Sequence, residues 1–216
     1  DNHESPVYIN SNTPSTHLVD TDGKGVEKIT ERGVVVAGRE YPLDCLIYAS
    51  GFEVGTEYQR RAGFDLTGRN GEKLSEHWAQ GMRTKHGIHV HGFPNAFFVQ
   101  PAQGANLISN IPHNLTEAAR TIAVMVSHAR TLGAKGIEVT KEAEDRWVDH
   151  VNNVASGTMY VAESCHSWYL GENVPGKIRQ FMPYIGGVGR YRAKCDEIAA
   201  NGYEGFILEK AAVPAG

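Results

Sequence analysis

Short runs of branched and aromatic residues punctuate the first half of the chain and predict β-strands. Residues 26–29 and 34–36 flank a polar turn that contains glycine, and they predict a hairpin. Residues 45–49 and 96–99 are continuous apolar runs that predict two buried strands. The first of these leads into a small-residue turn at Gly51, which would let backbone approach a ligand at the carboxyl end of a parallel strand.

The second half of the chain has the periodicity of helices. A long helix is predicted over residues 111–132 because its apolar positions recur at steps of three and four residues: Leu115, Ala118, Ala119, Ile122, Val126 and Ala129. Thr140 is predicted to cap a second helix, Lys141–Ala155. A third helix is expected over 191–200, and residues 206–208 predict a closing strand.

These elements together predict an α/β fold. A small antiparallel appendage would precede a doubly wound sheet, and helices would form the carboxyl-terminal end. No strand-to-helix junction reads G-x-G-x-x-G, so no loop of the usual kind cradles a pyrophosphate. The first sixteen residues are polar and lack a starting methionine, as expected for a chain that begins inside a larger protein; a trimmed mature end is the alternative.

Composition argues against several classes of function. The 216 residues carry a formal net charge of -4, and the basic residues do not cluster along the sequence, which argues against nucleic-acid binding. No apolar run approaches the ~20 residues that span a bilayer, and no signal peptide opens the chain. Three widely spaced cysteines without a C-x-x-C pair favour a reduced, cytoplasmic setting.

Three motifs suggest catalysis by the chain's own side chains, and each has a stronger structural interpretation. His89 and His91 would share one face of an extended strand, but nothing nearby supplies a third ligand, so no metal is expected. The sequence around Ser50 lacks the first glycine of a nucleophile elbow, so Ser50 is interpreted as a small residue that lets a cofactor approach. Cys165 and His166 are adjacent and seldom face each other, so the cysteine is interpreted as structural.

Two other positions are candidate contacts for a flat ligand. Trp168 precedes a Gly/Pro-rich turn with a lysine, and its indole would stack on a ring or donate to a polar group; the alternative is a core tryptophan that covers a loop. Free N–H groups at the start of the long helix would suit an electron-rich ring edge or an anion. Ordinary capping by Ser109 or Asn110 is the alternative there.

Six short motifs follow one another along the chain: LDCLIYASGF at 43–52, GFPNAFF at 92–98, LISNI at 107–111, SWYLGENVPGK at 167–177, YIGG at 184–187 and GYEGF at 202–206. In this order and spacing they resemble the carboxyl-terminal part of Baeyer–Villiger monooxygenases, which are flavoproteins of the phenylacetone and cyclohexanone monooxygenase type. The resemblance runs from about residue 17 to residue 208, which is nearly the whole chain.

The resemblance implies part of an enzyme with two dinucleotide-binding, Rossmann-like domains that uses FAD and NADPH. In such enzymes the flavin, reduced by NADPH, activates O₂, and one oxygen atom enters a ketone to give an ester or lactone. The family's G-x-G-x-x-G motifs and catalytic arginine lie upstream of the matched region. No catalytic residue is therefore expected in this chain, which should be inactive alone. Its expected partners are the amino-terminal part of the enzyme, a small ketone and O₂, with no nucleic acid and no membrane.

The resemblance also implies cofactor-binding roles for five residues. Gly51 and Phe52 match the strand-end motif beside the FAD domain. Asn110 and Ile111 match the turn whose backbone meets the pyrimidine edge of the flavin. Trp168 matches a tryptophan that contacts the nicotinamide cofactor.

A substrate-lining loop is implied for Asn106, Leu107 and Ile108, of which the last two indicate an apolar lining. Two departures from the family pattern accompany this loop. Ser50 replaces the usual threonine but keeps a hydroxyl, and residues 100–104 replace a more glycine-rich loop, which affects the shape of the pocket.

The matched region is predicted to divide into two parts. Residues 1–110 would be the carboxyl-terminal part of the FAD-binding domain with the β-hairpin. Residues 111–216 would be a helical segment that completes this domain and covers the active site. N- or S-oxygenation by a related flavin monooxygenase is the enzymatic alternative, and a non-catalytic binding module is the alternative from another class.

Overall fold

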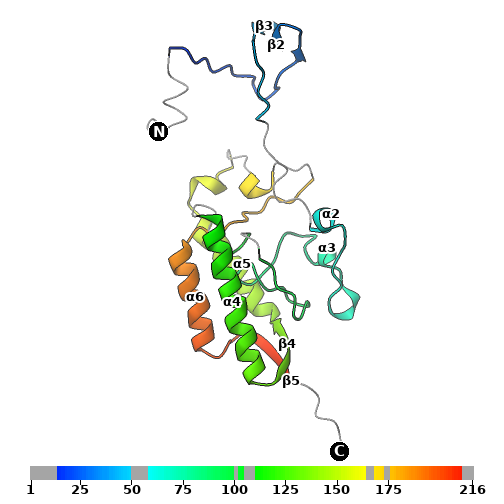
Figure 1. The fold of residues 1–216 in the computed structure, drawn as a ribbon, viewed down its shortest axis with the longest axis vertical. Helices are drawn as coiled ribbons and strands as arrows, with labels where there is room; N and C mark the ends of the chain where they lie inside the picture. The colour runs from blue at the N-terminus through cyan, green and yellow to red at the C-terminus, as the bar shows by residue number, and fades with distance from the viewer. Residues whose placement is uncertain are drawn as a thin grey trace, which may run out of the picture. The chain divides into compact units, whose positions relative to one another are not determined.

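The computed structural model describes residues 14–49, 58–99, 102–104, 110–163, 168–172 and 176–210 (Figure 1). The chain divides into two compact units, Asp1–Phe52 and Glu53–Gly216. Each unit is described by itself below.

Most of the helices belong to the second unit. Its elements, in chain order, are α2 (Tyr58–Ala62), the 3₁₀ turn η1 (Arg69–Gly71), α3 (Leu74–His77), α4 (Ile111–Thr131), β4 (Ala134–Val139), α5 (Lys141–Ala155), η2 (Met159–Val161), η3 (Trp168–Leu170), α6 (Val188–Ala200) and β5 (Phe206–Lys210). The three predicted helices and the closing strand are confirmed. Among the described helices, none combines the length and the apolar composition that crossing a bilayer requires.

Single residues fix the start of α5 and the end of α4. The Thr140 side chain accepts a hydrogen bond from the Ala143 amide, as predicted for the start of α5. Gly133, with φ +67°, follows the last residue of α4 in the left-handed region that glycine adopts most readily.

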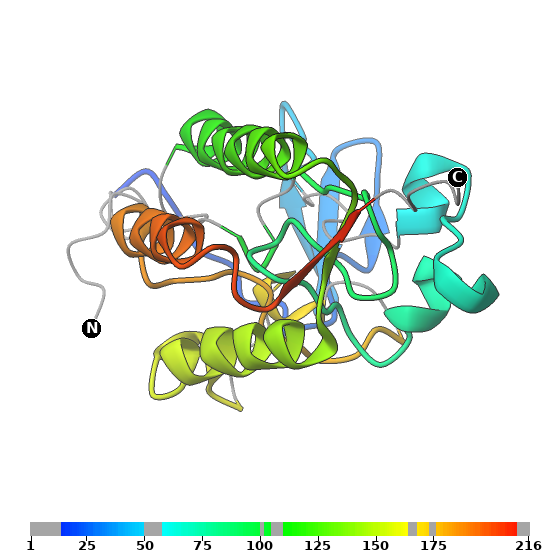
Figure 2. The same ribbon diagram turned by 90° about the horizontal axis from the view of Figure 1, so that it is seen from below.

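Strand β4 was not predicted from the sequence, and it pairs antiparallel with β5. Its sequence, AKGIEV, lacks a clear alternation, and its carboxyl half is buried on both faces. Figure 2 shows α4 and α5 on opposite sides of this two-stranded ribbon. The carboxyl half of β4 is buried and β4 contacts α4, whereas every residue of β5 keeps some exposure, so β5 forms the outer strand of the pair.

Two apolar clusters hold the helices in place. One consists of Trp147 and Val151 of α5, Tyr184, and Tyr191 and Cys195 of α6. The other joins α4 to the strands through Met125, Ala129, Ile137 and Tyr203. These clusters fix α5 and α6 around the segment 182–185, next to the loops considered below.

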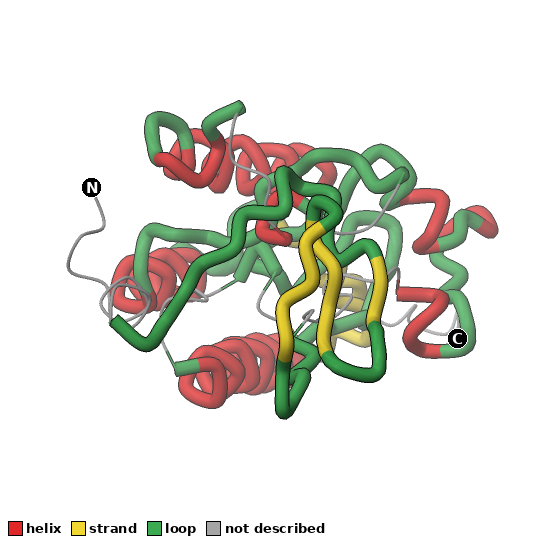
Figure 3. Tube along the Cα trace, turned by 90° about the horizontal axis from the view of Figure 1, so that it is seen from above, coloured by secondary structure: helices red, strands yellow, loops and turns green. Residues whose placement is uncertain are grey.

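The first unit contains the predicted hairpin, extended by a strand that was not predicted. The antiparallel order is β1 (Lys28–Ile29), β2 (Gly33–Val36), β3 (Arg39–Pro42), and Figure 3 shows the three strands side by side. Strand β3 has a mostly polar sequence; it is fixed by pairing with β2 and by a side-chain bond from Thr30 to Glu40 (2.8 Å).

The prediction of a buried strand over residues 45–49 is wrong for this structure. The run is extended but unpaired, and Ile47 and Tyr48 are 82% and 74% exposed. A strand forms only where a neighbour satisfies its backbone groups, and no described residue pairs with this run. Apolar composition alone therefore did not produce a strand.

Residues 96–99 likewise form no strand, contrary to prediction. The Phe98 amide donates to the Ile88 carbonyl oxygen (2.9 Å), and the ring packs against Tyr58 and Trp78. The aromatic content did mark a core position. The ladder that would make it a strand has no partner among the described residues.

Candidate functional site

The short loop 102–104 is fixed by Gln103, which is 1% exposed. The Gln103 side chain accepts from the Thr84 hydroxyl (2.7 Å) and donates to the Met82 carbonyl oxygen (2.7 Å). Its backbone N–H donates to the Met182 carbonyl oxygen (2.6 Å), and its own carbonyl accepts from the Trp147 indole (2.8 Å). Every polar group of Gln103 is thus used to hold the loop.

The turn at Gly87 packs directly against the same loop. Gly87 has φ +71°, and a Cβ at this position would lie 2.6 Å from both the Ala102 carbonyl oxygen and the Gly104 nitrogen. Only glycine fits such an approach without displacement of backbone. The turn and the loop therefore position each other.

The start of α4 leaves the Ile111 backbone N–H available. The Asn110 side chain accepts from the His113 amide (3.3 Å), Pro112 carries no N–H, and the Asn114 amide donates to the Asn110 carbonyl oxygen (3.2 Å). Among the described residues, the Ile111 amide has no acceptor, and the residue is 46% exposed. The predicted capping by Asn110 is confirmed, and it leaves the Ile111 N–H without an acceptor in the described part of the chain.

Trp168 lies in η3, where its ring stacks on Tyr169 with centroids 4.1 Å apart, and it is 38% exposed. The Tyr169 and Leu170 carbonyl oxygens accept from the amides of Met182 and Gln180. The 180–182 strip thus supports η3, and through the Met182 carbonyl oxygen it also holds Gln103. The Trp168 element and the loop 102–104 share this support.

The structure places three of the eight predicted site residues. Among the described contacts, no hydrogen bond or ring contact joins Trp168 to Asn110 or Ile111. The other five lie outside the described residues: Gly51, Phe52, Asn106, Leu107 and Ile108.

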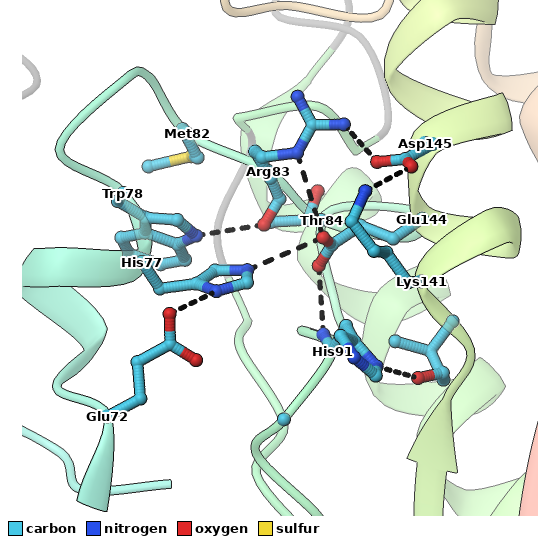
Figure 4. A network of polar contacts seen from close by, with 12 residues as sticks. Glu72, His77, Trp78, Met82, Arg83, Thr84, His91, Lys141, Glu144 and Asp145 are labelled. Atoms are coloured by element: carbon cyan, nitrogen blue, oxygen red, sulfur yellow. Dashed lines mark hydrogen bonds and ion pairs between the residues drawn. The ribbon is translucent and has the colours of Figure 1, made fainter. Parts of the chain in front are cut away.

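A network around the buried carboxylate of Glu144 was not anticipated from the sequence (Figure 4). Glu144 is 1% exposed; one oxygen accepts from the His91 amide (2.9 Å), and the other lies 3.4 Å from His77 Nε2 and 3.8 Å from Arg83 Nε. The signal was available, because Glu144 precedes Trp147 by three positions on the buried face of α5. The network ties α5 to the segment 77–91.

The imidazole of His77 lies between two carboxylates of this network. Its interaction with Glu144, supported by Glu72 at 3.2 Å, raises the pKa of the imidazole, while burial opposes that rise. The charged imidazole is therefore favoured in the folded state.

The histidine run does not form the extended strand in which two imidazoles would share one face. Lys85 and His89 exchange backbone bonds (2.7 and 3.1 Å) around a turn whose residues His86 and Gly87 have positive φ. Burial lowers the pKa of His89 to about 3 and the pKa of His86 well below its usual value. No group of three potential metal ligands occurs in the described part of the chain.

Comparison with curated proteins finds relatives over most of the chain. It is 42% identical over 179 residues to pentalenolactone D synthase of Streptomyces arenae, covering 82% of this chain and 30% of the relative. It is 38% identical over 183 residues to the FAD-binding monooxygenase hmp7 of Hypomyces subiculosus, covering 84% and 30%. Identity is 39% over 159 residues to the Baeyer–Villiger monooxygenase ATR8 of Stachybotrys chlorohalonatus, covering 74% and 25%. The chain thus spans less than a third of the length of these relatives.

Solved structures agree with this comparison. The closed crystal structure of cyclohexanone monooxygenase matches with a TM-score of 0.76 and 32% identity, covering 96% of this chain and 38% of that one. The oxidized steroid monooxygenase bound to NADP matches with a TM-score of 0.75 and 31% identity, covering 94% and 37%. No protein-family model matches.

These matches confirm the predicted α/β fold of part of a Rossmann-type flavoprotein with a small β appendage and carboxyl-terminal helices. They also confirm the resemblance inferred from the six motifs. The chain belongs to the Baeyer–Villiger monooxygenases, and it matches a carboxyl-terminal portion of these enzymes.

Proposed function

We propose that this chain is the carboxyl-terminal portion of a monooxygenase that uses FAD and NADPH to insert one atom of O₂ into a ketone, giving an ester or lactone. The names of its relatives support this proposal, since they include a FAD-binding monooxygenase, a Baeyer–Villiger monooxygenase and a structure with bound NADP. Within the chain, the observation that carries the proposal is the available Ile111 amide at the start of α4.

The residues at this helix start fit one edge of a flavin. An electron-rich pyrimidine edge accepts hydrogen bonds, and the positive end of a helix dipole favours the negative charge that a reduced flavin carries there. Asn110 blocks the His113 amide and Pro112 removes another donor, so Ile111 offers one directed N–H. When bound, the flavin supplies the activation of O₂.

The remaining roles of this chain are to bind, orient and exclude water. In this proposal Gly51 and Phe52 lie beside FAD, Trp168 contacts the nicotinamide cofactor, and residues 106–108 line the ketone pocket. Gln103 holds the loop that precedes residues 106–108 through its bonds to Thr84 and Met82. A rigid support of this kind keeps a pocket wall in position during reaction.

The proposal includes the predicted division into residues 1–110, as part of the FAD-binding domain, and residues 111–216, as the segment that completes it. It also includes a cytoplasmic location and inactivity of the chain alone. The chain would then acquire flavin and activity only together with an amino-terminal part that carries the G-x-G-x-x-G motifs.

Replacement of the Ile111 N–H tests the proposal. Ile111→Pro removes this donor and is compatible with the backbone, since Asn110 is already extended (φ -64°, ψ 119°) and proline is favoured in the first helical turn. In the complete enzyme we expect weaker FAD retention and roughly tenfold slower flavin reduction by NADPH, the equivalent of one lost hydrogen bond to a charged group. Ile111→Val keeps the N–H and is the matched control.

The outcome is read by flavin absorbance, by stopped-flow reduction and by product analysis with a ketone and an amine in parallel. Equal behaviour of the proline and valine variants would show that this amide does not contact the flavin. If the enzyme turned over the amine and not the ketone, the proposed ketone oxygenation would be wrong, and the reaction would be N-oxygenation.

A further inference from the structure

A cavity of ≈ 450 Å³ lies between α5, α6 and the turn at Lys85. Its wall includes three cations from three separate parts of the chain: Lys85, Arg146 of α5 and Lys194 of α6. The carboxylates of Glu197 and Glu204 also line it. Its volume is within the range of small-molecule sites. None of the eight predicted site residues lines it.

The cations of this cavity have no counter-ion among the described residues. No ion pair within 4.0 Å joins Lys85, Arg146 or Lys194 to a described carboxylate.

Lys85 is the most deeply placed of the three cations. The residue is 9% exposed, and its ammonium lies 5.5 Å from the centre of the Trp147 ring. Burial lowers the pKa of Lys85 to about 8, and the neighbouring charges of Arg146 and Lys194 contribute to the same shift. The charge of Glu197 opposes this shift, but no described carboxylate lies within ion-pair distance of the ammonium, so an anion in the cavity would stabilise it.

Two histidines in the wall of this cavity can also form hydrogen bonds to a ligand. Nε2 of His86 and Nε2 of His150 are buried and have no hydrogen-bond partner. Burial lowers the pKa of both rings, so each is neutral near pH 7 and keeps one N–H to donate. Unpartnered buried polar atoms are rare in native structures, and a ligand is one explanation for a pair of them beside one cavity.

We propose that this cavity binds the phosphate group of a small hydroxyl-bearing molecule, with Lys85, Arg146 and Lys194 around the phosphate. A phosphate monoester presents several charged oxygens at once, which suits three cations on different sides better than a single carboxylate would. Glu197 and Glu204 would accept hydrogen bonds from hydroxyl groups of the same ligand, as acidic residues do from a ribose. This site is independent of the function proposed above.

Calorimetric titration with inorganic phosphate and with ribose 5-phosphate tests the proposal in the complete protein that contains this chain. We expect ribose 5-phosphate to bind more tightly than inorganic phosphate, because only the sugar ester reaches the carboxylates. Arg146→Gln and Lys194→Gln should each weaken binding by about tenfold, as expected for the loss of one charge-assisted contact. Lys135→Gln removes the same charge from an exposed position outside the cavity and should leave the affinity unchanged.

The nicotinamide cofactor also carries a phosphate monoester, so NADP⁺ is titrated in parallel. The ester that competes with inorganic phosphate for the cavity, ribose 5-phosphate or NADP⁺, shows which kind of molecule supplies the bound phosphate. Binding that Lys135→Gln weakens as much as Arg146→Gln would be non-specific and would overturn the proposal, as would no binding by any of the three compounds.

A second readout concerns Lys85 itself. With the lysine side chains labelled for NMR, saturating phosphate should move the titration midpoint of Lys85 upward from about 8, because a bound dianion stabilises the ammonium. An unchanged midpoint in the presence of bound phosphate would place the ligand elsewhere.

Discussion

At the scale of single residues, Gln103 and Glu144 use most of their polar atoms in buried contacts. Both fix loops to α5: Gln103 through the Trp147 indole and Glu144 through the His91 amide. Neither residue belongs to a sequence motif that would predict this role. Their effects are measurable because a buried polar group that loses its partner destabilises the folded state.

Gln103→Leu should destabilise the protein by about 1–3 kcal/mol, since the Thr84 hydroxyl loses its acceptor and a leucine must adopt φ +53°. Gln59→Leu, at an exposed position of α2, is the control and should change the free energy of unfolding by less than about 0.5 kcal/mol. Urea unfolding followed by tryptophan fluorescence measures both. Equal values for the two variants would contradict the anchoring role of Gln103.

His77 should make stability depend on pH. Its pKa is raised in the folded state, so its contribution is complete below the ordinary value near 6.5 and is lost as the pH rises through the folded-state pKa. Compared with His77→Gln, the wild type should therefore lose stability as the pH rises above about 6.5 and passes the raised pKa of His77. Unfolding of both proteins across this range measures the difference, and His113→Gln at the exposed start of α4 is the control. Parallel profiles for wild type and His77→Gln would refute the assignment.

At the scale of elements, the Gly87 turn packs closely against the backbone of the loop 102–104. Gly157, which follows α5, provides a comparison: its φ is +79°, close to the +71° of Gly87, but a Cβ there would meet nothing within 4 Å. Alanine at Gly157 tests only the cost of the left-handed backbone conformation, whereas alanine at Gly87 adds the steric overlap with the loop.

Gly157→Ala should destabilise the protein by about 1 kcal/mol, from the left-handed conformation alone. Gly87→Ala should have a larger effect, by at least another 1–3 kcal/mol of overpacking against backbone. Thermal unfolding of the two variants measures the difference. If Gly87→Ala were no more destabilising than Gly157→Ala, the loop 102–104 would have to move away at no cost, and the mutual positioning of turn and loop would be wrong.

At the scale of the whole molecule, the two described free cysteines report on separate units. Cys45 is exposed in the first unit, and Cys195 is buried between α6 and α5 in the second. Burial raises the pKa of the Cys195 thiol to about 11, so little thiolate is present near pH 7.

In a Cys165→Ser background, a thiol reagent should modify Cys45 within the native protein, and Cys195 only as the second unit unfolds. Mass spectrometry after labelling at increasing urea concentration follows both sites, and the Cys45 rate serves as the internal reference. Native-state modification of Cys195 at the same rate as Cys45 would show that the core around α6 opens locally.

The sequence by itself determined the long helices, the cap at Thr140, the hairpin and, through six motifs, the family. These features depend on local spacing or on residue order, both of which are visible in one dimension. Strand pairing depends on a neighbour, so the apolar runs at 45–49 and 96–99 predicted strands that the described chain does not form, while β4 was missed. Only the tertiary structure decided that Glu144 is a buried anchor and that Lys85, Arg146 and Lys194, spread over more than a hundred positions of sequence, meet around one cavity. Burial and electrostatic fields arise from distances in space, and the fold alone fixes those distances.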